Sequence, residues 1–321
     1  MKKKSSEKIT LANFIAIIGL VALAVFTFLG REYMSGGELG WDFLYAIGIT
    51  TFASVLLWLL IKTKGAENDL GKWRVLEYSL LALYIIVVIP VSYLFIKNFF
   101  VVNENKLAVQ QSAKADIAKI DKMFDDYKAN ESKAISQTIT GLQNAYGQKR
   151  DAKLVEFFDN NHLSDMGKID GYQTHCKTNI LDQGDAIRNE FNKEKESILN
   201  AVNGWSVILI PMKSKRVEDL AQSIGTELTK VSSEKSELIP HINHESAEYS
   251  LGEEQKFEYK VNPEELQFRN KLASFSGFSI IGLAVVLLIH LFILFNYIVA
   301  YRTSTLGVNK NMDEDGGILL R

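Results

Sequence analysis

Four long apolar stretches constrain this chain more than any other feature of its sequence. None of them contains Asp, Glu, Lys or Arg, and each is long enough to cross a hydrocarbon layer of about 30 Å as a helix. They are Ile9–Leu29, Phe43–Ile61, Tyr78–Ile96 and Leu272–Ala300. A helix satisfies its own backbone donors and acceptors in lipid, whereas an open strand does not. The sequence therefore predicts an all-α, multi-pass membrane protein with four transmembrane helices.

The polar remainder of the chain divides it into five predicted segments. Residues 9–101 hold three spans joined by short loops, and residues 272–300 hold the fourth. Residues 102–271 form a charged region that is long enough to bury a core of its own. We expect this region to be a mainly helical domain outside the membrane, between a short N-terminal segment, 1–8, and a polar tail, 301–321.

The orientation follows from the basic residues that flank the spans. Lys and Arg concentrate on the cytoplasmic side in short loops. The first loop carries only Arg31, whereas the N-terminal segment and the second loop carry four basic residues each: Lys2, Lys3, Lys4 and Lys8, and Lys62, Lys64, Lys72 and Arg74. We therefore expect both termini in the cytoplasm and residues 102–271 outside, in the periplasm of a bacterium. The first apolar stretch is too long for the h-region of a signal peptide, so we interpret it as a retained span.

Apolar residues recur every three or four positions through most of the region 102–271, as in amphipathic helices. This spacing predicts helices over about 103–158, continuing directly from the third span, over about 172–202, and around Val217–Val231. No proline occurs between Pro90 and Pro211, which favours long helices. Two short runs, Trp205–Ile210 and Lys256–Val261, have the length and composition of strands, so a small β element is expected.

Two prolines carry specific predictions. Pro90 lies inside the third span, where it predicts a kink. Asn262-Pro263 resembles a helix start, because Asn can cap a helix and Pro is preformed for its first position. We expect this helix to continue into the fourth span, which makes Asn262 and Pro263 candidates for coupling the outer domain to the membrane.

Few residues suggest chemistry. His241 and His244 have the spacing of a metal pair, but no second pair accompanies them, and we interpret them as polar loop residues. His175-Cys176 could suggest an activated thiolate, but adjacent helical residues point in different directions. The single cysteine, Cys176, excludes an internal disulfide, and we interpret it as a partly buried thiol. We expect no catalytic, metal or cofactor site, and the net charge of −2 gives no indication of nucleic-acid binding.

His290 is the one ionisable residue deep within a span. Such residues are functional candidates by default. We favour a hydrogen bond between helices over a role in proton relay. Small residues in the first span suit close helix packing: Ala12, Ala16, Gly19, Ala22 and Ala24.

Three functions fit this layout. The first is a non-enzymatic structural subunit of an envelope-spanning complex, with a helical stalk that reaches across the periplasm to partner subunits. The second is an extracytoplasmic ligand sensor, although no cytoplasmic output domain follows the fourth span. The third is an oligomeric channel, although polar residues are scarce along the spans.

The layout resembles the TssN family of inner-membrane subunits of Bacteroides-type type VI secretion systems. The resemblance covers the whole chain: the Lys-rich start, the three clustered spans, the helical outer domain, and the last span ending in Asn296-Tyr297-Ile298-Val299-Ala300-Tyr301-Arg302. It implies a non-enzymatic role in the bacterial inner membrane, in which the protein anchors a contractile injection apparatus. The expected partners are other inner-membrane and periplasmic subunits, further copies of this chain, and the lipid bilayer.

Overall fold

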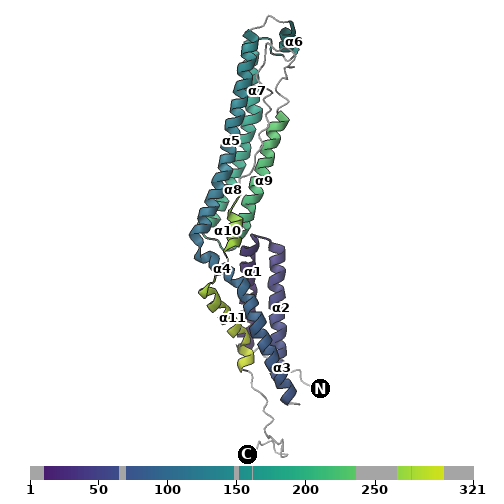
Figure 1. Ribbon diagram of the computed structural model, residues 1–321, viewed down its shortest axis with the longest axis vertical. Helices are drawn as coiled ribbons and strands as arrows, with labels where there is room; N and C mark the ends of the chain where they lie inside the picture. Colours follow the sequence, from purple (N-terminus) through teal and green to yellow (C-terminus); the bar gives the residue numbers. More distant parts are fainter. Residues whose placement is uncertain are drawn as a thin grey trace, which may run out of the picture. The chain divides into compact units, whose positions relative to one another are not determined.

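The computed structural model describes residues 11–64, 70–147, 152–160, 162–235, 266–275 and 277–299. Within these residues the regular structure is entirely helical and no strand occurs, which confirms the predominance of helices but shows no β element. The chain forms two compact units (Figure 1). We call Met1–Glu104 with Phe275–Arg321 the membrane unit, and Asn105–Ser274 the polar unit.

The membrane unit contains four helices that are long and apolar enough to cross a bilayer. Each of the four predicted spans thus contains a helix of sufficient length and apolar composition. They are α1 (Leu11–Ser35), α2 (Leu39–Lys64), a composite third helix of α3 (Leu70–Leu83), the π-helical turn η1 (Tyr84–Val88) and α4 (Ile89–Glu104), and α11 (Ile280–Val299). Helix α1 packs against α2, α4 and α11.

Two glycines allow α1 to approach its neighbours closely. A Cβ on Gly30 would lie 2.1 Å from the carbonyl oxygen of Phe95 in α4, and one on Gly19 would lie 2.8 Å from Cγ1 of Ile293 in α11. Contacts this short leave room only for glycine, as in other close helix crossings within membranes. Of the predicted small-residue face, Ala16 and Gly19 are buried, while Ala12, Ala22 and Ala24 remain partly exposed.

The irregularity predicted at Pro90 takes the form of a π-helical turn. Proline has no N–H, so it cannot donate to the carbonyl group four residues earlier in the helix. The turn Tyr84–Val88 ends two residues before Pro90, and the helix then continues to Glu104. A widened turn of this kind is a common way for a helix to absorb such a disruption.

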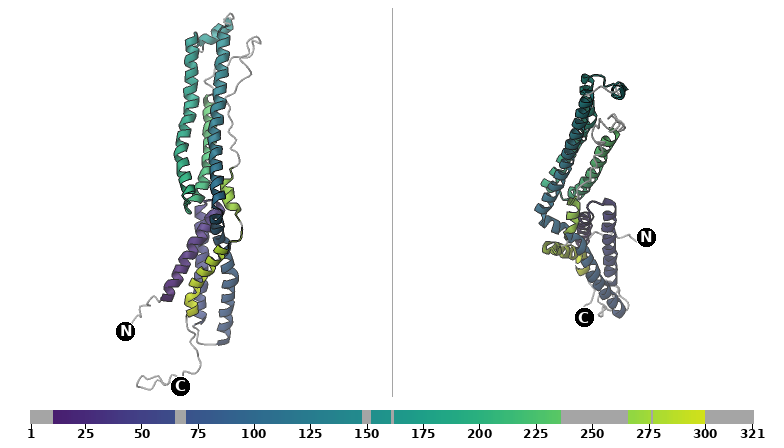
Figure 2. Two further views of the ribbon diagram at one scale, coloured as in Figure 1. Left: turned by 90° about the vertical axis from the view of Figure 1, so that its left-hand side faces the viewer. Right: turned by 45° about the horizontal axis from the view of Figure 1, so that its top comes forward.

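The polar unit is an antiparallel bundle of long helices. Helix α5 (Lys106–Gly147) has 42 residues and is about 63 Å long. Helix α6 (Ala152–Asn160) follows it, and α7 (Met166–Cys176), the π-helical turn η2 (Lys177–Leu181) and α8 (Asp182–Asn203) return along α5 (Figure 2). Helix α9 (Leu209–Lys235) packs on both α5 and α8, and the short α10 (Phe268–Ser274) lies against α5 and α9.

The apolar stripes predicted for these helices form the core of the bundle. Helix α5 contributes buried residues along nearly its whole length, and Phe124 packs on Phe191 of α8 with ring centroids 5.7 Å apart. The spacing of three and four residues follows the helical repeat, so the apolar residues of each helix lie on one face. In α5, α8 and α9, the other two helices pack against that face. The buried residues of α5 include Val109, Ala113, Ile117, Ile120, Phe124, Tyr127, Ile135, Ile139 and Leu142.

The predicted strand Trp205–Ile210 is wrong. Gly204 caps the end of α8, Trp205 has a φ of 53°, and α9 already begins at Leu209. A positive φ is incompatible with extended backbone, so this apolar run is a turn followed by the start of a helix. The other predicted strand, Lys256–Val261, lies outside the described residues.

Two predicted helix continuations are also wrong. The helix predicted over 103–158 is interrupted at Asn105, between α4 and α5, and α5 ends at Gly147. The helix predicted to enter the fourth span without a break ends instead at Ser274, and α11 begins at Ile280. Ser279 explains this second break, because its Oγ accepts a hydrogen bond from the backbone N–H of Gly282 at 3.0 Å and so caps α11. Asn262 and Pro263 lie outside the described residues.

Candidate functional site

His290 forms a polar contact in the middle of the membrane unit. The hydroxyl of Tyr84 lies 2.9 Å from Nδ1 of His290, and the two rings meet edge to face with centroids 5.5 Å apart. Both side chains are buried. Tyr84 is the first residue of the π-helical turn and His290 lies in α11, so the contact joins the third span to the fourth.

The second ring nitrogen of His290 bears on the choice between packing and proton relay. A relay needs a donor or acceptor at both nitrogens. Nε2 is buried and has no hydrogen-bond partner within the described residues. The contact with Tyr84 is a hydrogen bond between helices.

A second group of polar contacts ties together one end of the membrane unit. The Tyr297 hydroxyl donates to Oε1 of Glu77 at 2.6 Å, and Nζ of Lys64 donates to the backbone carbonyl of Tyr297 at 2.5 Å. The side-chain amide of Asn296 donates to Asn13. These contacts join the start of α1, the end of α2, the start of the third span and the end of α11. The start of α1 and the end of α11 therefore lie at the same end of the membrane unit.

The opposite end has its own polar contacts. Nε of Arg31 lies 3.1 Å from Oδ1 of Asp42, which joins α1 to α2 across their short connection. The Oγ of Ser279 donates to Oε1 of Glu104 at 2.7 Å, which joins the start of α11 to the end of α4. Hydrogen-bonded polar side chains thus lie at both ends of the spans, where they join the helices to one another.

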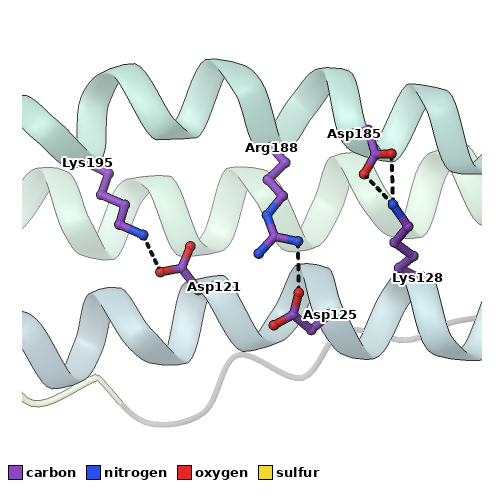
Figure 3. Close-up of polar contacts among 6 residues, drawn as sticks. All are labelled: Asp121, Asp125, Lys128, Asp185, Arg188 and Lys195. Carbon is purple, nitrogen blue, oxygen red and sulfur yellow. Dashed lines mark hydrogen bonds and ion pairs between the residues drawn. The ribbon is translucent and has the colours of Figure 1, made fainter.

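A row of three ion pairs joins α5 to α8 in the polar unit (Figure 3). The three carboxylate–cation distances are 2.5, 2.8 and 3.0 Å. The pairs are Asp121–Lys195, Asp125–Arg188 and Lys128–Asp185. The sign reverses once along the row, because α5 supplies two acids and then a base while α8 supplies the matching two bases and an acid. Charges arranged in this way specify partner, direction and register between two helices.

A buried carboxyl group interrupts the apolar stripe of α5. Glu131 is buried, and its Oε1 accepts a hydrogen bond from the hydroxyl of Ser232 in α9 at 2.7 Å. Burial raises the pKa of Glu131, and the hydrogen bond from Ser232 opposes that effect. Glu131 lies four residues after Tyr127, on the same stripe of α5. A charged residue at a position of the apolar stripe is visible in the sequence, and Glu131 was not among the predicted site residues.

Tyr127 packs against the second π-helical turn. Its hydroxyl donates to the carbonyl oxygen of Ile180 at 3.1 Å, within η2. Gly184 makes room for the ring, because a Cβ there would lie 2.6 Å from Cε1 of Tyr127. Burial is the main cause that raises the pKa of the Tyr127 hydroxyl, and the nearby Glu131 charge adds to it. The turn, the ring and the glycine therefore form one interlocked contact between α5 and α8.

Asp116 fastens the returning chain to α5. Its Oδ2 accepts hydrogen bonds from the backbone N–H groups of Gln267 and Phe268, both at 2.7 Å. Phe268 and Leu272 of α10 are buried in the bundle. The chain thus leaves the polar unit beside the first turns of α5, at the end where it entered.

The remaining candidates from the sequence do not come together. His175 is exposed and Cys176 is buried in the bundle, where burial raises the pKa of its thiol. His241 and His244 lie outside the described residues. Among the described side chains, no group of three or more His, Cys, Asp or Glu residues is arranged to hold a metal ion.

Comparison with known proteins is the other route to a function. The chain matches no protein-family model, no curated protein and no solved structure. The construction of the polar unit therefore carries the argument for function.

Proposed function

We propose that this protein is a non-enzymatic structural subunit of the bacterial inner membrane, which anchors an envelope-spanning complex through its helical polar unit. The observation that carries this proposal is the construction of that unit. Helix α5 alone is about 63 Å long. The helices of the unit share one core, and the ion pairs of Figure 3 join α5 to α8 in a defined register. A bundle of this kind resists bending and offers a long lateral surface for protein contacts.

The attachment of the bundle supports the same role. The polar unit begins directly after one candidate span and ends directly before another, and Asp116 holds α10 beside the start of α5. Both connections therefore leave from one end of the bundle. In this proposal the other end, near α6, is the one that contacts partners.

The resemblance to the TssN family supports the proposal of a specific complex for this role. Under this proposal the partners are other inner-membrane and periplasmic subunits of a type VI-like secretion apparatus, together with further copies of this chain. The proposed topology places both termini in the cytoplasm and the polar unit in the periplasm, as the flanking basic residues predict.

Gentle purification from native membranes tests the structural role. We expect the protein to co-purify with a stoichiometric set of envelope proteins. A Gly184→Leu variant should lose these partners while remaining in the membrane, because the new side chain collides with Tyr127 inside the bundle. Gly171→Leu is the matched control, since a Cβ at Gly171 meets nothing within 4 Å. A lone oligomer that passes ions in liposomes would support a channel instead.

Cysteine labelling tests the topology. In a Cys176→Ser background, Ser132→Cys lies in α5 and Ser304→Cys in the C-terminal tail. An impermeant thiol reagent added from outside should label the first variant and not the second. Labelling of Ser304→Cys alone would reverse the proposed orientation.

A further inference from the structure

The turn between α8 and α9 exposes a group of apolar side chains at one end of the polar unit. Ile208 is 60% exposed and Leu209 is 41% exposed, and Met212 is also exposed. Leu107, at the start of α5, is 73% exposed. We call Leu107, Ile208, Leu209 and Met212 the turn patch. Exposed apolar groups of this kind mark binding surfaces more often than single scattered residues do.

The turn patch is held firmly to the start of α5. The side-chain amide of Gln110 donates to the carbonyl oxygen of Val202 at 2.9 Å, at the end of α8. Nζ of Lys106 lies 5.4 Å from the ring centroid of Trp205. Trp205 itself adopts a φ of 53°, which is unfavourable for a residue with a side chain. The turn is thus fixed in a strained conformation beside Lys106, with Ile208 and Leu209 facing outward.

If α11 crosses the bilayer, as its length and composition allow, its ends give the limits of the hydrocarbon layer. Helix α11 has 20 residues and is about 30 Å long, which matches the thickness of that layer. Ser279, which caps this helix, is hydrogen-bonded to Glu104 at 2.7 Å. Glu104 therefore lies at the boundary between acyl chains and headgroups.

Chain length then sets the depth of Lys106. It follows Glu104 by two residues, and two residues of chain span at most about 7 Å. The headgroup layer on each side of a bilayer is roughly 5–8 Å thick. Lys106, and with it the Trp205 turn that it contacts, is consequently within reach of this layer.

We propose that the turn patch inserts into the boundary between lipid headgroups and acyl chains, so that the bilayer surface is its binding partner. A tryptophan beside a lysine, followed by exposed Ile and Leu, is the composition that membrane-interfacial segments use. Ile208 and Leu209 enter the outer edge of the acyl region, while Lys106 stays among the headgroups. This contact would stabilise the α8–α9 end of the polar unit on the membrane surface. The proposal does not depend on whether the proposed secretion partners are correct.

Fluorescence of the reconstituted full chain tests this proposal. In a Cys176→Ser background, Ile208→Cys and Met212→Cys are labelled with an environment-sensitive NBD dye. The labelled protein is reconstituted at a low protein-to-lipid ratio in phosphatidylcholine–phosphatidylglycerol vesicles. Met166→Cys is the matched control, because Met166 is also an exposed methionine, 43% exposed, but begins α7 at the far end of the bundle.

We expect blue-shifted emission at residues 208 and 212, and several-fold stronger quenching there by phospholipids with a nitroxide at acyl carbon 5 than at residue 166. Equal, water-like emission at all three positions would overturn the proposal. Blue-shifted emission without nitroxide quenching would also overturn it, because a protein surface would then cover the patch.

A second measurement uses the unaltered protein, so it does not depend on how the variants fold. Wild-type protein in vesicles that contain a diazirine phospholipid should give lipid cross-links within residues 205–212. The α6 end of the polar unit should give none. Cross-links confined to the four spans would contradict the proposal.

Discussion

The hydroxyl of Tyr84 contacts Nδ1 of His290 at 2.9 Å, which connects the π-helical turn of the third span to the middle of the fourth. Hydrogen bonds between membrane helices contribute about 0.6 kcal/mol on average and up to about 1.7 kcal/mol. We expect a Tyr84→Phe, His290→Leu double-mutant cycle, measured by unfolding in micelles, to give a coupling energy in this range. The same cycle with Tyr78→Phe, whose side chain is 57% exposed, should give none.

The crossing of α1 and α4 depends on Gly30. A methyl group at this position would lie 2.1 Å from the carbonyl oxygen of Phe95, so Gly30→Ala should force the two helices apart. Overpacking of this kind costs about 1–3 kcal/mol. Thermal unfolding in micelles should show a clear loss of stability. Gly48→Ala in α2 should show none, because a Cβ there meets nothing within 4 Å.

The polar unit offers a similar pair of glycines with opposite expected effects. Gly184→Ala should destabilise the bundle by about 1–3 kcal/mol, because the new Cβ lies 2.6 Å from Cε1 of Tyr127. Gly171→Ala should stabilise it by about 0.5–1 kcal/mol, because Gly171 lies within α7 with open space around it and alanine favours helix. Amide hydrogen exchange along α5 and α8 measures both effects. A loss of protection in both variants would contradict the open space found around Gly171.

Glu131 should make the stability of the polar unit depend on pH. Its pKa is raised in the folded state, so the folded protein binds a proton more readily than the unfolded one. The stabilisation that the protonated Glu131 gives the folded state is fully present below 4.5, the pKa of this carboxyl in the unfolded chain. This stabilisation is lost as the pH rises through the raised pKa of the folded state. We expect Glu131→Gln to reduce the decline in hydrogen-exchange protection of α5 and α9 above pH 4.5. Glu190→Gln, at an exposed position in α8, is the control and should leave the decline unchanged.

The three ion pairs between α5 and α8 predict a rescue experiment. Reversing the charges of Asp121, Asp125 and Lys128 places like charges opposite one another, and should destabilise the polar unit by about 0.2–1 kcal/mol per pair. Reversing the three partners in α8 as well should restore most of the stability at low salt. If the second set of reversals instead destabilised the unit further, the register of Figure 3 would be wrong.

The sequence alone was sufficient for the parts of this protein that depend on local pattern. The four spans follow from uncharged apolar runs, because lipid requires backbone groups to be satisfied within each segment. The helices of the polar unit follow from apolar residues spaced at three and four. The strand predicted over Trp205–Ile210 failed because a short apolar run has no periodicity that separates a strand from a turn and the start of a helix.

Only the tertiary structure decided which distant residues meet. Tyr84 and His290 are separated by 206 positions, and Asp116 and Phe268 by 152. Nothing in the local pattern of either partner identifies the other, since a hydrogen bond depends on the distance and direction between two atoms that the whole fold brings together. The break at Ser279 has the same origin: the serine caps α11 while it is hydrogen-bonded to Glu104, and that contact exists only once α4 and α11 have packed.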